Sequence, residues 1–130
     1  MPPQTIDEEL RGMDESELVS VAQNKLFVIG CHTSDHPYLT NCTRTQLMKE
    51  IRGAKDLLEQ VSRKTVDTFS YPAGDYNCAV ADAVKQAGFK LAFAVNRRCN
   101  LEDPRMALPR VGVYRVGLGL LAAKSHGLFA

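Results

Sequence analysis

Apolar runs suited to β-strands alternate with helical patterns along this chain, and that alternation restricts its fold more than any other feature. The apolar runs lie at residues 25–30, 66–70, 91–95 and 108–115, and the helical patterns at 15–23, 43–61 and 77–88. A strand, a helix and a second strand in succession normally form a right-handed crossover between parallel strands. The sequence therefore predicts an α/β fold whose functional loops leave the carboxyl ends of the strands.

The longest predicted helix, over 43–61, has the clearest pattern. Thr43 and Gln46 have the spacing of a capping box. One apolar stripe follows at helical intervals, formed by Leu47, Ile51, Ala54, Leu58 and Val61. The first helix starts with a similar pair, Asp14 and Glu17. Local signals thus predict where both helices begin.

The same kind of signal organises the rest of the chain. Asn77 is expected to cap the third helix, and Gly88 to end it in a left-handed conformation. Residues 1–13 are expected to form a flexible lead-in to a single domain over 14–130. Within that domain, residues 116–124 are expected to form a short terminal helix.

Composition excludes several classes of protein. The 130 residues carry a formal net charge of +1, which gives no overall field to attract nucleic acid. The longest apolar stretch, residues 116–123, is much shorter than the roughly 20 residues of a membrane span. The four cysteines include no Cys-x-x-Cys pair, and no leader precedes them, so we expect reduced, mostly buried thiols in a cytoplasmic protein.

Two histidines, His32 and His36, come directly after the apolar run at 25–30. Four residues on a helical turn rise about 6 Å, so both imidazoles can point to the same side and share one metal ion. Pro37 disfavours a helix at His36 and favours a loop or a single turn. Spacing alone equally allows two unrelated surface or capping histidines, whereas the position after a strand favours a metal site.

A second polar loop follows the next predicted strand, at residues 71–76. Pro72 fixes one backbone torsion and Gly74 permits close approach of the backbone, so amide groups can face a ligand. Tyr71 and Tyr76 are amphipathic and suit contact with a sugar. Without further information, this loop is best explained as a connecting turn.

Together, the two loops resemble a known family. The run Ile29-Gly-Cys-His32-Thr-Ser-Asp-His36-Pro-Tyr-Leu39 resembles the His-Ser/Thr-x-x-His-Pro-x-Leu motif of polysaccharide deacetylases, the metal-dependent carbohydrate de-N-acetylases of carbohydrate esterase family 4. Phe69-Ser-Tyr-Pro72-Ala-Gly74-Asp-Tyr-Asn77 resembles the family's Arg-x-Pro-x-Gly motif, in the form of its bacterial exopolysaccharide members. Ala87-Gly88-Phe89 and Leu108-Pro109-Arg110-Val111 match later parts, so the resemblance covers roughly residues 14 to 115.

This resemblance implies a partial (β/α) barrel of the glycoside hydrolase/deacetylase type that lacks its first strand and helix. It implies hydrolysis of N-acetyl groups on an acetylated amino-sugar polymer or oligomer. One divalent metal ion, usually zinc, would be held by His32, His36 and an aspartate. The substrate groove is then expected to include Tyr71, Pro72, Gly74 and Tyr76.

Departures from the family pattern bear on activity. The family's strand ending in Thr-Phe-Asp-Asp, which supplies its base and third metal ligand, has no counterpart here, and Ser70 stands where many members have an arginine. Asp35 and Asp75 could replace the missing carboxylates and His126 the family's late general acid, although loop aspartates usually cap turns. Two histidines alone hold zinc weakly, so we expect weak or no activity from this chain by itself.

Three functions remain open on the sequence. The first is the metal-dependent deacetylase, the second a non-catalytic carbohydrate-binding or scaffold protein of the same family. The third is an α/β domain whose histidines are satisfied by hydrogen bonds. A barrel that lacks strands also exposes sheet edges, so we expect a homo-oligomer formed through these edges or an open sheet.

Overall fold

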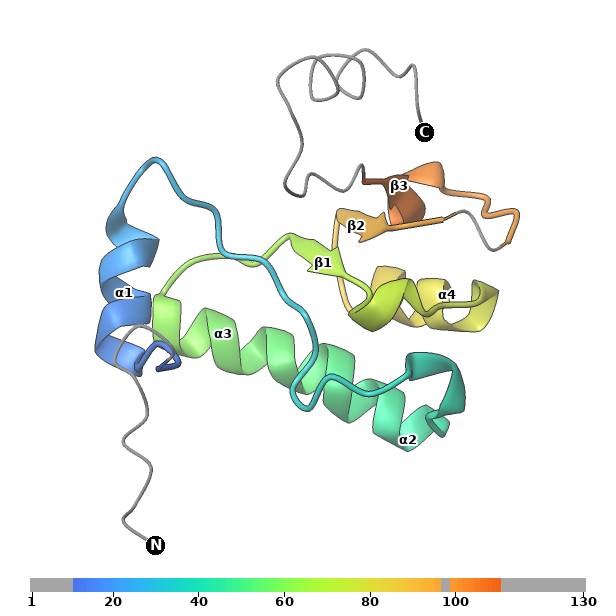
Figure 1. The fold of residues 1–130 in the computed structure, drawn as a ribbon, viewed down its shortest axis with the longest axis horizontal. Coiled ribbons are helices and arrows are strands. Elements are labelled where there is room, and N and C mark those ends of the chain that lie inside the picture. Colours follow the sequence, from blue (N-terminus) through green and yellow to red (C-terminus); the bar gives the residue numbers. More distant parts are fainter. Residues whose placement is uncertain (1–10, 97–98, 111–130) are drawn as a thin grey trace, which may run out of the picture.

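The computed structural model describes residues 11–96 and 99–110, and within them three short strands form one parallel sheet. In sheet order these are β1 (Thr68–Ser70), β2 (Leu91–Ala94) and β3 (Leu108–Pro109). The prediction of an α/β protein with parallel strands is confirmed at that level. Strand β1 lies at one edge of the sheet (Figure 1).

Two helices begin where the sequence predicts. Helix α1 (Glu15–Gln23) starts with the capping box of Asp14 and Glu17, and α4 (Cys78–Gln86) starts at the Asn77 cap. Helix α4 connects β1 to β2, so the strand–helix–strand order of the sequence forms a parallel crossover (Figure 1). None of the helices in the described part of the chain has the length and apolarity needed to cross a bilayer.

The longest helix contains an irregularity that the sequence pattern does not predict. It consists of α2 (Arg44–Leu47), a π-helical segment η3 (Met48–Gly53) and α3 (Ala54–Ser62). In an α-helix, successive side chains turn by about 100°. Glu50 and Ile51 lie three and four residues after Leu47, on one face of the helix, and both are buried within η3.

The strand predicted at residues 25–30 is wrong. Leu26 and Val28 are 87% and 82% exposed, and only Cys31, just beyond the run, forms a parallel bridge to Phe69. A strand needs a neighbouring strand to satisfy its backbone groups, and the described residues place none beside this run. An exposed apolar segment therefore leads into the histidines.

The core lies between the sheet and the helices. Its largest fully buried side chains are Tyr71, Tyr76, Phe69, Leu39, Ile51, Val66, Val80 and Val84. All four cysteines are free, as predicted, but the expectation that most are buried is wrong. Only Cys31 is buried, whereas Cys78 is exposed.

Several predictions fall on parts of the chain that lie outside the described residues. These are the helix at 116–124, the end of the strand at 108–115, most of the lead-in at 1–13, and His126. The division into a lead-in and a single domain over 14–130 stays a prediction.

Candidate functional site

The candidate site lies on residues 31–42, called the histidine loop below. Its first residue, Cys31, is anchored to β1 by two backbone hydrogen bonds. The Cys31 amide donates to the Thr68 carbonyl, and the Ser70 amide donates to the Cys31 carbonyl, each at 2.9 Å. This anchor places the loop beside the carboxyl end of β1, where the sequence predicted functional loops.

His32 and His36 face each other across this loop. Their ring centroids lie 4.8 Å apart with an interplanar angle of 66°. The Nδ1 atom of His32 lies 2.7 Å from the carbonyl oxygen of Ser70. Because a carbonyl only accepts, Nδ1 carries the proton, and in the neutral ring Nε2 keeps its lone pair for a metal ion. The structure brings the two predicted ligands together, with both residues exposed.

The backbone between the histidines adopts an unusual conformation that side chains hold in place. Thr33 and His36 have φ angles of 67° and 55°, in the left-handed region that non-glycine residues rarely adopt. The Thr33 hydroxyl accepts a hydrogen bond from the His36 amide at 3.1 Å. The Glu50 carboxylate accepts two more, from the amides of Ser34 at 3.1 Å and Asp35 at 2.9 Å.

Glu50 is the residue that sequence reasoning missed. It lies three residues after Leu47 and four before Ala54, so helical spacing already puts this charged residue on the apolar face of the helix. In the structure it is only 6% exposed and lies within the π-helical segment η3. No sequence signal marks that segment.

The two candidate aspartates take structural positions. Asp35 is exposed and forms an ion pair with Lys49 at 3.5 Å. Asp75 is buried, and its Oδ2 accepts hydrogen bonds from the amide and the hydroxyl of Thr40, both at 2.9 Å. Asp75 therefore ties the far end of the histidine loop to the turn after β1.

The carboxylates of Glu50 and Asp75 also affect the thiol of Cys42. Burial, and then the negative charges of Glu50 and Asp75, raise the pKa of Cys42. The Cys42 thiol donates a weak hydrogen bond to the Tyr38 carbonyl at 3.6 Å. Cys42 is thus a protonated structural group of the loop at neutral pH.

The donor set fits a divalent metal ion in part. Two imidazoles face one another, and His32 has the anchored Nδ1 that metal-binding histidines usually have. A catalytic zinc ion normally has three protein ligands. Among residues 11–96 and 99–110, no group of three His, Cys, Asp or Glu side chains could hold a metal ion. The described residues therefore supply two ligands and not a complete site.

The loop at residues 71–76 is largely buried, whereas the sequence predicts that it contacts a sugar. Tyr71 and Tyr76 are 0% and 1% exposed, and their rings stack at a centroid distance of 4.6 Å. The Tyr71 hydroxyl donates to the Met106 carbonyl at 2.7 Å, and burial raises the pKa of Tyr71. Pro72 and Gly74 are also buried. These rings complete the core, so their faces are not available to a sugar in this structure.

Only a small part of this turn reaches solvent. In the 3-10 turn η4 (Pro72–Gly74), Ala73 is exposed and has a φ of 53°. Gly74 has a φ of 64°, and a Cβ atom on it would lie 3.1 Å from Cγ2 of Val95. Glycine is therefore needed at position 74 for both backbone conformation and space.

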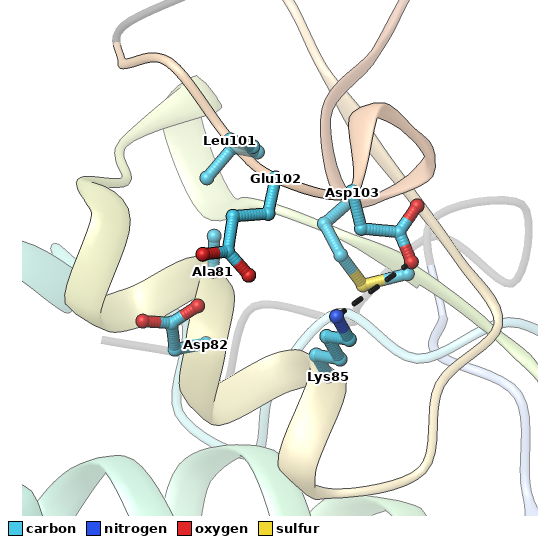
Figure 2. A pocket seen from close by; sticks show the side chains of 7 residues that line it. Ala81, Asp82, Lys85, Leu101, Glu102 and Asp103 are labelled. Atoms are coloured by element: carbon cyan, nitrogen blue, oxygen red, sulfur yellow. Dashed lines mark ion pairs between the residues drawn. The ribbon is translucent and has the colours of Figure 1, made fainter.

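A small cavity on another side of α4 does not suit a sugar. It measures about 20 Å³, between α4 and the segment that leads into η5 (Pro104–Ala107), as Figure 2 shows. That volume holds about one water molecule. Lys85 and Asp103, 4.0 Å apart, form an ion pair across it, and the histidines do not line it. It is a junction between α4 and η5.

Comparison with known proteins extends these observations. A family model described as polysaccharide deacetylase matches residues 4–92. No match is found among curated proteins.

Three solved structures share the fold at low sequence identity. A polysaccharide deacetylase from Bacillus cereus is 21% identical with a TM-score of 0.73, over 87% of this chain and 36% of its own. A de-N-acetylase from Aggregatibacter actinomycetemcomitans is 16% identical with a TM-score of 0.68, over 85% of this chain and 52% of its own. A deacetylase from Streptococcus pyogenes, in complex with acetate, is 23% identical with a TM-score of 0.55, over 62% of this chain and 36% of its own.

The chain therefore spans between about a third and a half of the length of these proteins. The likeness in structure shows a common fold. The family model covers most of the chain and includes both the histidine loop and the turn after β1. This chain belongs to the polysaccharide deacetylase family.

Proposed function

We propose that this chain takes part in the metal-dependent deacetylation of carbohydrates, the hydrolysis of N-acetyl groups on an amino-sugar polymer. The observation that carries the proposal is the close edge-on contact of the His32 and His36 imidazoles, with the His32 ring anchored through Nδ1. Membership of the polysaccharide deacetylase family supports a hydrolase acting on carbon–nitrogen bonds.

In this proposal His32 and His36 hold a divalent ion, and imidazole nitrogens favour zinc. When bound, such an ion polarises the acetyl carbonyl and lowers the pKa of a coordinated water. The hydrogen bond to Ser70 prevents the His32 ring from rotating and keeps Nε2 as the donor atom. The exposed backbone at Ala73, which follows the same strand, is the part of the turn that we expect to face the acetyl group.

The third ligand and the general base are the missing parts of this chemistry. Asp75 is already engaged with Thr40, and Asp35 pairs with Lys49, so neither is placed as a third ligand beside the imidazoles. His126 remains our proposed general acid. We therefore propose that this chain by itself binds zinc weakly and has weak or no activity.

The fold that supports this function is proposed to be part of a (β/α) barrel. The strands β1, β2 and β3 are parallel, and each lies next to its neighbour in the sequence, as in such barrels. The TM-score of 0.73 to the Bacillus cereus deacetylase supports this assignment. We also propose that a second copy associates through the exposed sheet edges, and the exposed Leu26 and Val28 would add apolar surface to that contact.

A second candidate function is binding of a carbohydrate without catalysis. The absence of a third ligand among the described residues favours it. The burial of Tyr71 and Tyr76 speaks against it, because sugar-binding sites normally present aromatic faces to the ligand.

One experiment separates these functions. Zinc is titrated by calorimetry into the wild type, His32→Ala and His36→Ala, and acetate release from a chitin oligomer is measured on the same samples. Asp35→Asn serves as the control, since its side chain lies on the same loop but points to Lys49. Zinc binding that both histidine variants lose supports the metal site, and acetate release supports catalysis. A wild type that binds no zinc contradicts the proposal.

A further inference from the structure

We propose that Glu50 is a positioning residue for the candidate metal site. Its carboxylate holds the histidine loop in the conformation that turns His32 and His36 toward one ion. This inference rests on the proposed metal binding by those two histidines. Glu50 lies on a different helix from the loop that carries the two histidines.

Within the described residues, the hydrogen bonds of the Glu50 side chain go to the histidine loop. Its Oε2 accepts the amides of Ser34 and Asp35, at 3.1 Å and 2.9 Å. A buried carboxylate is unfavourable unless hydrogen bonds compensate its charge. In the described parts of the chain no cation forms an ion pair with Glu50, which is 6% exposed. Its charge is therefore compensated chiefly by the backbone between the two histidines.

The Glu50 hydrogen bonds act on a part of the loop whose backbone conformation is unfavourable by itself. Ser34 and Asp35 lie between Thr33 and His36, the two residues with left-handed backbone. Such conformations persist only where the surroundings hold them. The Glu50 bonds act on the two peptide groups between these residues. Without them we expect the loop to relax to ordinary angles and the ring of His36 to turn away from His32.

Glu50 reaches the loop from the buried face of the helix. Ile51 is 1% exposed and belongs to the core, which fixes the rotation of the helix at this point. Glu50 lies three residues after Leu47 and four before Ala54, so it faces inward beside Ile51, within the π-helical segment η3. Such segments recur at functional sites. Here the segment places one charged group beneath a loop 15 and 16 residues earlier in the chain.

The test compares three variants. Glu50→Ala removes the acceptor, and Glu50→Gln keeps one accepting oxygen in nearly the same shape. Asp56→Ala is the control, because Asp56 is an exposed carboxylate on the neighbouring α3 whose hydrogen bonds, within the described residues, go to Arg52 and not to the histidine loop. Circular dichroism establishes whether each variant is folded. If Glu50→Ala does not fold, Glu50→Gln still tests the proposal.

Two readouts are needed. The first is the nuclear Overhauser effect between the imidazole protons of His32 and His36 in metal-free protein, together with hydrogen exchange of the Ser34 and Asp35 amides. The second is zinc affinity by calorimetry. In Glu50→Ala we expect the ring contact to be lost, both amides to exchange faster, and zinc affinity to fall by about 10- to 100-fold. Glu50→Gln should recover most of each, and Asp56→Ala should match the wild type.

The outcomes distinguish this inference from the proposed function. An intact ring contact and unchanged amide exchange in a folded Glu50→Ala would overturn the role of Glu50, whether or not zinc binds. Altered ring contact with unchanged zinc affinity would also overturn it, because the loop geometry would then not matter for the ion. A wild type that shows the ring contact but binds no zinc would contradict the proposed function, and with it the relevance of Glu50 to a metal.

Discussion

The histidine loop and the turn after β1 lie at the same end of the sheet, and the protein holds them in opposite ways. In the histidine loop the imidazoles are exposed, and buried carboxylates on other segments, Glu50 and Asp75, hold the backbone. In the turn, the rings of Tyr71 and Tyr76 are themselves the anchor. Two motifs that look equally functional in sequence thus have different tasks. Substitutions in the turn should reduce stability, and substitutions in the histidine loop should reduce metal binding.

The largest effect is expected at Tyr71. Tyr71→Ala should lower the free energy of unfolding by about 3–5 kcal/mol, because it removes a fully buried ring from the core. Chemical denaturation monitored by circular dichroism measures this change. Tyr38→Ala is the control, since Tyr38 lies in the histidine loop and is 62% exposed, and it should change stability by less than about 0.5 kcal/mol. Equal losses in the two variants would break the comparison.

A smaller loss is expected at Gly74. Gly74→Ala should cost about 1–3 kcal/mol, because alanine is strained at a φ of 64° and its Cβ would press on Val95. Gly53→Ala is the matched control. Gly53 lies in η3 and has no atom within 4 Å of a built Cβ, so alanine should fit without strain. Denaturation curves showing no difference between the variants would contradict the tight fit of the turn.

The apolar segment that leads into the histidine loop should affect association and leave stability nearly unchanged. Leu26 and Val28 are 87% and 82% exposed, so replacing both with serine should change the unfolding free energy by less than about 0.5 kcal/mol per site. Sedimentation velocity should show weaker self-association. Leu57→Ser, on α3, controls for the general loss of exposed apolar surface. A wild type that stays monomeric at high concentration would disprove this role.

The smallest effect concerns acid stability near η5, the segment that accepts the Tyr71 hydroxyl. A hydrogen bond from Arg105 lowers the pKa of Asp103 from 3.8 to about 2. Since the folded pKa is depressed, the resulting stability is fully present above the unfolded value of 3.8 and is lost as the pH falls toward 2. Arg105→Gln should raise the Asp103 pKa, as measured by NMR titration. Arg52→Gln, which removes a separate ion pair with Asp56, should leave it unchanged.

Local signals predicted much of this fold. The capping pairs at Asp14 and Thr43 begin helices in the structure, and Gly88 has the left-handed conformation expected after α4, with a φ of 87°. The strand at 25–30 failed for a physical reason. Its apolar residues are compatible with a strand, but pairing depends on a neighbour that the described residues do not provide.

For the candidate site, the sequence predicted that the two histidines lie together but not that the tyrosine rings are buried. The spacing of His32 and His36 after the predicted strand indicated a shared ion, and the structure places the rings together although that strand does not form. Tyr71 and Tyr76, which the sequence assigned to a groove, have their rings buried in the core, because an amphipathic ring suits a core as well as a surface. Only packing decides between the two.

What the sequence by itself determined are the features set within a few residues: helix starts, the left-handed end of α4, the polar loops and the order of the histidines in the chain. Capping and turn formation act between near neighbours, so their residues suffice to identify them. Tertiary structure alone decided that Glu50 faces the histidine loop, that Asp75 binds Thr40, and which aromatic rings are buried. Those contacts join residues far apart in the chain, and they exist only once helices and sheet have packed.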